Sequence, residues 1–398
     1  MSWPNVALGE LFDIARGGSP RPIDDYITDS PDGVNWISIK DASNSSKYIT
    51  STAKKILPSG VTRSREVKPG DFLLTNSMSF GRPYILRTSG CIHDGWLLLR
   101  GDKKVIDQDY FYQLLGSDFI YRKFQSLAAG AVVKNLNIDL VKTVKVPLPP
   151  LSEQRRIAAI LDKADALCAK RREAIAKLDT LSMATFYEIC GSPLGPPVSI
   201  GKPDQQDADS YVPLVEVAQL ATGHTPSRRV PEYWGGKIPW ISLTDIRRLD
   251  GRLAEEAEQF TNEMGIANSS AVVLPEQTVC FSRTASVGFA TILGREMATS
   301  QDFVNWICGE RIDPFYLLAA FRASKRYLVS KSTGSTHKTI YFPVAERFHV
   351  FLPDISKQHR FAEALRKIWK LRSAMETQAP SADQFFESLQ QRAFAGTL

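Results

Sequence analysis

Glycine-rich phosphate-binding motifs are missing from this sequence of 398 residues. It contains no G-x-G-x-x-G and no G-x-x-x-x-G-K-[ST] segment, so it lacks the glycine turn that lets a backbone approach a bound nucleotide. Its five histidines show no H-E-x-x-H spacing, and we expect no metal site. These absences argue against a chain that carries its own nucleotide or metal chemistry.

Cysteines and long apolar runs are also scarce. The five cysteines form no C-x-x-C pair, which argues against a disulfide framework and a zinc module; they are Cys91, Cys168, Cys190, Cys280 and Cys308. No segment approaches 18 consecutive apolar residues, and the segment from Met1 to Asn5 has neither the basic nor the apolar part of a signal peptide. We therefore expect a cytoplasmic protein without membrane spans.

The remaining composition is that of a globular protein with a small excess of positive charge. Hydrophobic residues make up 43% of the chain, and 49 Lys and Arg stand against 43 Asp and Glu, for a net charge of +6. The length predicts two or three domains. The charge is compatible with a polyanionic partner but does not establish one.

The second half of the chain repeats the first at an offset of about 204 to 207 residues. Trp36 to Asp41 matches Trp240 to Asp245, and the segment from Gly130 to Leu161 matches the one from Gly334 to Leu365. This period is too long for a solenoid and indicates duplication of a whole domain followed by a helix.

Each repeat predicts an α+β domain with a twisted mixed sheet. Short β-rich runs at 36–39, 71–74, 84–86, 96–99 and 144–146 are bounded by turn residues, and 109–124 and 313–330 have the pattern of amphipathic helices.

A long helix is predicted from Ser152 to about Ile189 and a second from Ser356, broken or kinked near Pro380. Each of these long helices has an apolar stripe, and burying the two stripes against each other favours an antiparallel pair. The expected divisions are a domain at 1–150, a helix at 151–190, a linker at 191–210, a domain at 211–353 and a helix at 354–398.

Polar and basic loops recur at matched positions in both halves. Their side chains are those that hydrogen-bond base edges and phosphates. In the first half they are Arg16, Ser19, Arg21, Lys40, Asn44, Arg63, Arg65, Asn76, Ser77, Ser79, Arg82, Lys134 and Asn135. In the second half they are His224, Thr225, Arg228, Arg229, Thr244, Arg247, Arg248, Ser282, Arg283, Thr284, Ser286, Ser335, Thr336, His337 and Lys338.

Two pairs of residues resemble parts of catalytic sites but have simpler structural interpretations. Asp354 with Lys357 resembles part of a nuclease motif, but an acid at a helix start is explained by the helix dipole. The pair His93 and Asp94 allows a catalytic interpretation, although a structural hydrogen bond is favoured.

The fourth repeated block is specific enough to indicate a family. The run Pro147-Leu148-Pro149-Pro150-Leu151-Ser152-Glu153-Gln154-Arg155-Arg156-Ile157-Ala158 and its echo from Leu352 to Leu365 resemble the specificity subunit of type I DNA restriction-modification systems. The resemblance covers the whole chain. It implies two tandem target recognition domains joined by two long antiparallel spacer helices, with an internal pseudo-twofold repeat.

The resemblance further implies a non-catalytic reader of double-stranded DNA. Each domain would bind one half of a split, asymmetric target through the loops above. Modification subunits would carry S-adenosylmethionine, and motor-nuclease subunits would use ATP and Mg for cleavage. The modification subunits would dock mainly on the helices, at Gln154, Arg156, Ile157, Leu161, Gln358, Arg360, Phe361 and Leu365.

Two other classes of function remain open from the residues alone. One is a DNA methyltransferase or nuclease with unrecognised motifs, although the Asn-Pro-Pro-aromatic or Asp-Pro-Pro-aromatic segment of an N6-adenine methyltransferase is missing. The other is a stand-alone DNA-binding regulator. Copurification with a methyltransferase chain would separate the specificity subunit from both.

Overall fold

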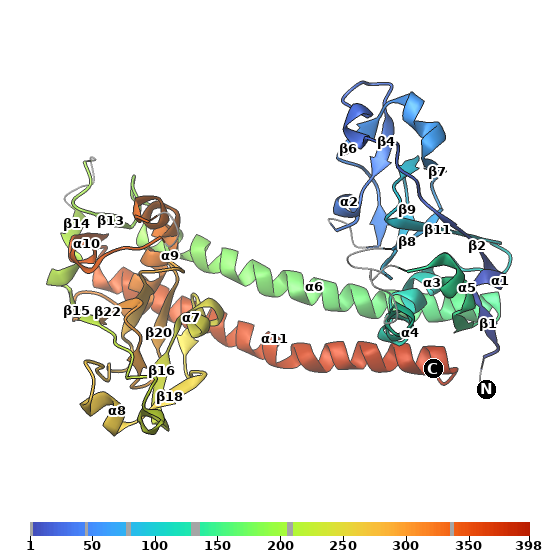
Figure 1. Ribbon diagram of the computed structural model, residues 1–398. Helices are drawn as coiled ribbons and strands as arrows, with labels where there is room; N and C mark the ends of the chain where they lie inside the picture. The colour runs from blue at the N-terminus through green and yellow to red at the C-terminus, as the bar shows by residue number, and fades with distance from the viewer. Residues whose placement is uncertain (1–2, 44–46, 77–80, 129–135, 205–209, 335–337) are drawn as a thin grey trace. The chain divides into compact units, whose positions relative to one another are not determined.

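A computed structural model describes residues 3–43, 47–76, 81–128, 136–204, 210–334 and 338–398 (Figure 1). Contacts divide the chain into two units. Unit 1 comprises Met1–Arg172 and Thr377–Leu398, and unit 2 comprises Glu173–Glu376. The sequence placed boundaries between domains and helices, whereas the contacts group each domain with parts of both long helices. Each unit is therefore a domain with its own pair of helix segments.

Unit 1 contains two five-stranded mixed sheets and a small pair. One sheet has the order β2 (Phe12–Arg16), β11 (Trp96–Gly101), β8 (Phe72–Thr75), β9 (Pro83–Leu86) and β5 (Tyr48–Ile49). The other has the order β3 (Ile27–Thr28), β6 (Lys54–Ile56), β4 (Val34–Ile37), β10 (Gly90–Ile92) and β7 (Arg65–Val67). The pair is β1 (Asn5–Ala7) with β12 (Lys145–Pro147).

Unit 2 repeats the main sheet of unit 1. Its order is β15 (Ala218–Thr222), β22 (Phe303–Cys308), β19 (Val279–Ser282), β20 (Ala290–Leu293) and β17 (Leu253–Ala254). The register is also the same, because Leu73 pairs with Leu98 in unit 1 and Cys280 with Asn305 in unit 2, each pair 207 residues apart from its counterpart. The repeat predicted from the sequence is thus a repeat of topology.

Two further sheets complete unit 2. They are β18 (Gln259–Thr261), β16 (Trp234–Ile241) and β21 (Ala298–Thr299), and β13 (Val198–Ile200), β23 (Phe348–Phe351) and β14 (Tyr211–Pro213). The expectation of a plain linker at 191–210 is wrong, because β13 lies inside it. Val198 is fully buried against the core of unit 2, and β13 pairs with β23, so this segment is part of the domain.

Short helices cover the sheets. Unit 1 has α1 (Leu8–Leu11), α2 (Ile39–Ser43), α3 (Gln108–Leu115), α4 (Asp118–Ala128) and α5 (Ile138–Thr143), with 3-10 turns Ile23–Asp25 and Pro58–Arg63. Unit 2 has α7 (Leu243–Leu249), α8 (Glu263–Ala267), α9 (Pro314–Lys331) and α10 (Phe342–Ala345), with 3-10 turns Leu214–Glu216 and Pro231–Tyr233. The helix predicted at 109–124 is two helices. Gly116 caps α3 and the Ser117 hydroxyl donates to the carbonyl of Leu114, which ends the first helix.

Two long helices, α6 (Leu151–Cys190) and α11 (Ile355–Ala395), run antiparallel within each unit. In unit 1, Arg171 donates to the side chain of Gln378 at 2.8 Å; in unit 2, Phe186 packs against Phe361 with ring centroids 5.4 Å apart. The second long helix was predicted to be broken or kinked near Pro380, and the break is wrong: α11 is one helix through this position. A proline removes one backbone donor, and the neighbouring turns of so long a helix keep their own hydrogen bonds.

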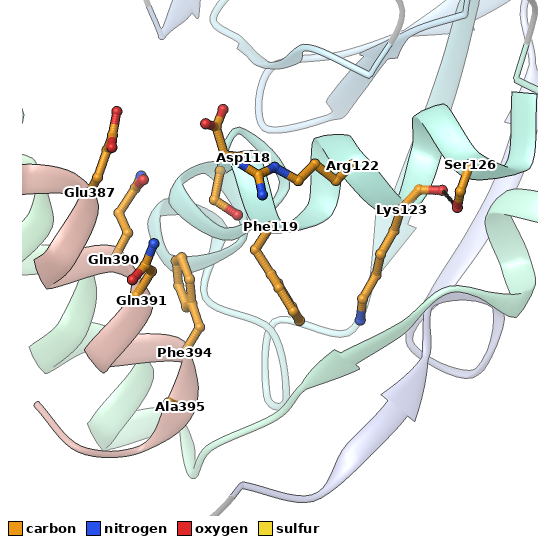
Figure 2. A pocket seen from close by; sticks show the side chains of 11 residues that line it. Asp118, Phe119, Arg122, Lys123, Ser126, Glu387, Gln390, Gln391, Phe394 and Ala395 are labelled. Carbon is orange, nitrogen blue, oxygen red and sulfur yellow. Dashed lines mark hydrogen bonds between the residues drawn. The ribbon is translucent and has the colours of Figure 1, made fainter. Parts of the chain in front are cut away.

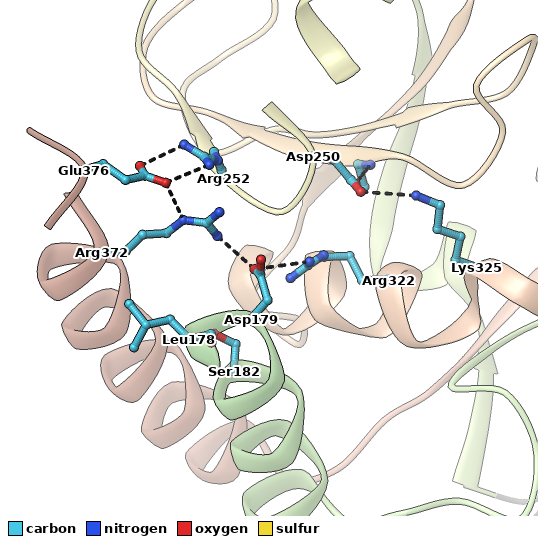
Figure 3. Close-up of polar contacts among 10 residues, drawn as sticks. Leu178, Asp179, Ser182, Asp250, Arg252, Arg322, Lys325, Arg372 and Glu376 are labelled. Atoms are coloured by element: carbon cyan, nitrogen blue, oxygen red, sulfur yellow. Dashed lines mark hydrogen bonds and ion pairs between the residues drawn. The ribbon is translucent and has the colours of Figure 1, made fainter. Parts of the chain in front are cut away.

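Basic residues tie each domain to its long helices. In unit 2, Arg252 forms a bidentate pair with Glu376 of α11 at 2.9 and 3.0 Å, and Arg372 joins Glu376 to Asp179 of α6 (Figure 3). In unit 1, Lys47 at the matched position before β5 pairs with Asp162 of α6 at 2.7 Å. Burial alone would lower the pKa of Lys47, but hydrogen bonds from its ammonium to Asp109 and Asp162 raise it overall. Lys47 therefore stays protonated in the folded protein and contacts Asp109 and Asp162 as a cation.

The repeated Trp-Ile-Ser-x-x-Asp segment forms a capping box in each unit. Ser242 caps α7, and its backbone and hydroxyl both donate to the Asp245 carboxylate, at 2.9 and 2.7 Å. Ser38 and Asp41 repeat these contacts at 2.8 and 2.7 Å. Asp245 is fully buried and also accepts from the backbone of Glu258. The repeated motif is therefore explained by helix capping and loop anchoring.

Replacing Asp245 by alanine should destabilise unit 2 by about 2 kcal/mol, because two backbone donors and a hydroxyl lose a buried acceptor. Urea denaturation of the purified chain measures the change. Thr244→Ala, at an exposed neighbour in the same helix, is the control and should change stability by less than about 0.5 kcal/mol. Equal stability of the two variants would contradict the capping role.

Among the described residues, no helix has the length and apolar character that crossing a bilayer requires.

Candidate nucleic-acid interface

In unit 1 four of the predicted residues meet at one acid, Asp94, in the turn before β11. The carboxylate accepts from Ser19 Oγ and Arg21 Nη2, each at 3.2 Å. The backbone carbonyl of Asp94 accepts from Arg16 Nε at 3.0 Å and from Asn76 Nδ2 at 3.3 Å. We call Arg16, Ser19, Arg21, Asn76 and Asp94 the first loop cluster. It brings together three loops that are far apart in the sequence.

In unit 2 the equivalent turn centres on Gln301. Its side-chain oxygen accepts from Thr225 Oγ1, and its backbone carbonyl accepts from Arg283 Nε at 3.0 Å. The backbone of His224 lies beside this turn because its N–H donates to Thr299 at 2.9 Å. We call His224, Thr225, Arg283 and Gln301 the second loop cluster.

Two of the contacts occur at matching sequence positions in the two clusters. Ser19 and Thr225 are 206 residues apart, and Asp94 and Gln301 are 207 apart, as are Asn76 and Arg283. The hydroxyl contact to the side chain and the side-chain contact to the carbonyl therefore recur in the second cluster. The contacts of Arg16 and Arg21 with Asp94 belong to the first cluster. What differs is the chemistry: a carboxylate stands in unit 1 where an amide stands in unit 2.

The charge state of the first cluster follows from its contacts. Burial would raise the pKa of Asp94, but the hydrogen bond from Ser19 and the charge of Arg21 hold it below its usual range. The Nδ1 atom of His93 accepts from the backbone of Gly95 at 2.9 Å, and burial lowers the pKa of His93. The structure thus gives His93 a structural hydrogen bond, with the Gly95 backbone rather than with Asp94. At neutral pH an ionised Asp94 lies beside a neutral imidazole.

Arg228 packs against two tryptophans of unit 2, whose rings also contact each other. Its guanidinium carbon lies 3.9 Å from the ring centroid of Trp234 and 4.8 Å from that of Trp240, and it donates to the Gln259 side chain. Stacking on aromatic faces fixes an exposed cation without neutralising it. A fixed, charged fork suits recognition of phosphate or guanine.

Most of the other predicted residues that the structure describes are exposed, and all of these except Thr244 are cations. Arg63 donates to the Tyr26 hydroxyl at 3.0 Å, Arg65 to the carbonyl of Arg16, and Arg247 to Ser286 Oγ at 3.2 Å. Others with exposed side chains are Lys40, Arg82, Arg229, Thr244, Arg248 and Lys338. Thr244, Arg247 and Arg248 were expected on a loop but lie on α7, because the capping box starts a helix there.

Three predicted DNA contacts are wrong as direct contacts because their side chains are buried. Asn76, Ser282 and Ser286 are 1%, 0% and 5% exposed. Asn76 supports the Asp94 turn, and Ser282 donates to the carbonyl of Thr284 within its own loop. Thr284 is half-buried and shares a 2.8 Å hydrogen bond with Thr339. These residues shape the reading loops rather than face a ligand.

Eight further predicted residues lie outside the residues that the structure describes: Asn44, Ser77, Ser79, Lys134, Asn135, Ser335, Thr336 and His337.

Most of the predicted partner contacts on the long helices are wrong because these side chains are buried in their own unit. Ile157, Leu161, Phe361 and Leu365 belong to the hydrophobic cores. Gln154 and Gln358 are 1% and 0% exposed. Only two of the predicted set, Arg156 and Arg360, are exposed, and Arg156 forms a bidentate pair with Glu153 at 2.7 and 2.8 Å.

Gln154 and Gln358 make one repeated contact. Gln154 Oε1 accepts from the backbone of Asp107 at 2.9 Å, and its Nε2 donates to the carbonyls of Val105 and Pro149. Gln358 repeats this with the backbone of Asp313 at 2.9 Å and the carbonyls of Arg311 and Pro353. Each amide joins the start of a long helix to the segment that leads into α3 or α9.

A groove of about 620 Å³ lies in unit 1 between α4 and the C-terminal part of α11 (Figure 2). Phe119 is 46% exposed there, and the Lys123 ammonium lies 4.2 Å from its ring centroid. Burial lowers the pKa of Lys123. The groove shares no lining residue with the first loop cluster and is a separate feature of unit 1.

The sequence pattern of basic and hydroxyl side chains did not include Gln301, nor Trp234 and Gln259 beside Arg228. Asp94 was singled out only with His93, for a catalytic or structural role, and not as part of the DNA-binding set. The signal that does locate Asp94 and Gln301 is the repeat, since both stand two residues before β11 or β22.

A chain with two like domains that each present the same arrangement of polar loops is, by class, a bipartite recognition protein. Its sequence matches the type I restriction modification DNA specificity domain twice, over residues 2–178 and 210–382. The chain therefore belongs to the type I restriction-modification DNA specificity family.

Relatives and solved structures agree with this family. The chain is 27% identical over 154 residues to the MjaIX specificity subunit of Methanocaldococcus jannaschii, covering 38% of this chain and 36% of that relative. It is 21% identical over 387 residues to the MjaVIII specificity subunit of the same organism, covering 92% and 86%. A solved chain from a type I restriction-modification system is 17% identical, with a TM-score of 0.63 over 100% of this chain and 98% of that chain. The last similarity establishes the fold.

Proposed function

We propose that this chain is the DNA-recognition subunit of a type I restriction-modification complex. Each domain binds one half of a split, asymmetric double-stranded target. The observation that carries this proposal is the pair of loop clusters: two of their contacts recur at matching positions, but their exposed side chains differ. Two surfaces of one shape and different hydrogen-bonding chemistry suit the reading of two different half-sites.

The chain itself performs no catalysis in this proposal. Modification subunits supply S-adenosylmethionine and methylate adenine, and motor-nuclease subunits supply ATP and Mg when the complex cleaves DNA. The support is the lack of a glycine turn and of an Asn-Pro-Pro-aromatic segment in the sequence. The complex acts in the cytoplasm, where its DNA substrate lies.

The deciding experiment coexpresses the chain with its modification subunit and maps methylated adenines across a genome. The expected result is one motif made of two short specific parts separated by a fixed gap. The chain alone should neither methylate DNA nor bind S-adenosylmethionine in a calorimeter. A motif without a gap, or methylation by the isolated chain, would contradict the proposal.

Arg283→Ala should weaken specific binding by about 1 to 3 kcal/mol and relax the preference in one half-site only. The guanidinium is held at the second loop cluster by one hydrogen bond through Nε, which leaves its other donors for a base. Electrophoretic mobility shift with the assembled complex and DNA variants measures both effects. Arg295→Ala, which removes an exposed arginine paired with Glu256 elsewhere in unit 2, is the control. Equal loss of affinity on every sequence would assign Arg283 to phosphate contact instead.

A further inference from the structure

The side chains at positions 94 and 301 occupy one structural position in two copies of the same domain. Each is anchored by a hydroxyl from the loop after the first strand of the main sheet, and the carbonyl of each accepts from the residue that follows β8 or β19. The two backbones are also held alike, by Gly18 N–H to Ile92 at 3.1 Å and His224 N–H to Thr299 at 2.9 Å. The fold therefore presents both side chains in the same way.

Both side chains reach solvent. The Asp94 side chain is 41% exposed, its partner Arg21 is 79% exposed, and Gln301 is exposed. Neither is needed to fill a core. A carboxylate among the cations of the first loop cluster repels a DNA phosphate, so contact with the DNA backbone does not account for it. A base edge that offers a donor does account for it.

We propose that Asp94 and Gln301 are equivalent base-reading positions and that they set different base preferences in the two half-sites. The inference rests on the proposed DNA recognition. Asp94 accepts from the amino group of cytosine while Arg21 donates to the paired guanine, which favours a C·G base pair. Gln301 favours adenine through the amide's paired donor and acceptor.

The hydrogen-bonding capacity of each side chain fits this assignment. The Asp94 carboxylate has lone pairs beyond those used by Ser19 and Arg21, and it has no donor. Gln301 Oε1 keeps one lone pair after accepting from Thr225, and its amide nitrogen donates to no group among the described residues. One position is thus an acceptor only, and the other is both donor and acceptor.

Isosteric variants test the assignment with little disturbance of the fold. Asp94→Asn keeps an acceptor for Ser19 and adds a donor, and Gln301→Glu keeps the acceptor for Thr225 and removes the donor. Each variant is assembled with the modification subunit, and methylated adenines are mapped. Asp94→Asn should lower discrimination at one base pair on the order of tenfold, in one half-site, and Gln301→Glu should do so in the other.

The controls separate this inference from the proposed function and from a structural role. Asp29→Asn, at an exposed acid of unit 1 outside the first loop cluster, should leave the motif unchanged. If the unaltered complex gives no gapped motif, the proposed function fails before either variant is considered. If the complex gives the motif but both variants methylate it with unchanged base preference, the assignment is overturned. Reduced methylation of an unchanged motif, together with a lower melting temperature, would also overturn it and assign both residues a structural role.

Discussion

Phe361→Ala should lower the free energy of unfolding of unit 2 by about 3 to 5 kcal/mol, the usual cost of emptying a buried phenylalanine site. Phe361 is fully buried and packs edge-to-face on Phe186, which in turn lies 5.5 Å from the ring of Tyr316. Hydrogen–deuterium exchange followed by mass spectrometry measures the effect by segment. Protection should fall in residues 173–376 and remain in unit 1.

Arg360→Ala is the matched control for this position. Arg360 is the exposed neighbour of Phe361 on α11, so its loss should change stability by less than about 0.5 kcal/mol. If Phe361→Ala left exchange unchanged and instead weakened binding of the modification subunit, Phe361 would be a partner contact after all.

Gln154→Ala should destabilise unit 1 by about 3 kcal/mol. Its amide satisfies one backbone donor and two backbone carbonyls at 2.9 Å, and a buried group left without a partner costs about 1 to 3 kcal/mol. Hydrogen–deuterium exchange of unit 1 at increasing denaturant concentrations would measure the change in its free energy of unfolding. Arg155→Ala is the control, because the Arg155 side chain is 66% exposed and lies 3.8 Å from Asp107.

A result in which Gln154→Ala and Arg155→Ala have equal stability would refute the bridging role. Gln358→Ala provides an internal repeat of the experiment, since its three contacts are the same in unit 2. The two glutamine variants should each affect a different unit.

Much of the fold was predictable because it depends on local patterns. The apolar stripe after Pro150 predicted a helix from Ser152 to about Ile189, and α6 is Leu151–Cys190. The repeat predicted two like domains, and their main sheets share strand order and register. Strand order itself was out of reach, because pairing between distant segments leaves no periodic signal in one sequence.

The partner contacts were mispredicted for a physical reason. Gln154 and Gln358 stand in a repeated motif, and repetition was interpreted as a shared docking surface. Two copies of a domain also contain the same buried backbone groups. A polar residue that hydrogen-bonds these groups therefore recurs in both copies, as a residue of a shared docking surface would. A glutamine on the apolar side of a helix, on the same face as Ile157 and Leu161, was the available sign of burial.

The candidate site was predicted in part, because the loops that flank the strands do gather at one turn in each unit. Arg16, Ser19 and Arg21 all donate hydrogen bonds to Asp94, while their contact with DNA stays a prediction. Burial of Asn76, Ser282 and Ser286 depends on how the loops fold over the sheet, which residue type does not encode.

The division of the chain into units has a consequence for synthesis on the ribosome. Unit 2 is continuous from Glu173 to Glu376, whereas unit 1 needs Thr377–Leu398, which emerge after all of unit 2. Trp3 donates to the carbonyl of Ala393, and Phe394 packs on Tyr110. Residues that are synthesised first therefore gain these contacts only after the C-terminal residues have been synthesised. The nascent first domain therefore exposes apolar surface while the second is being made, and unit 2 completes its fold first.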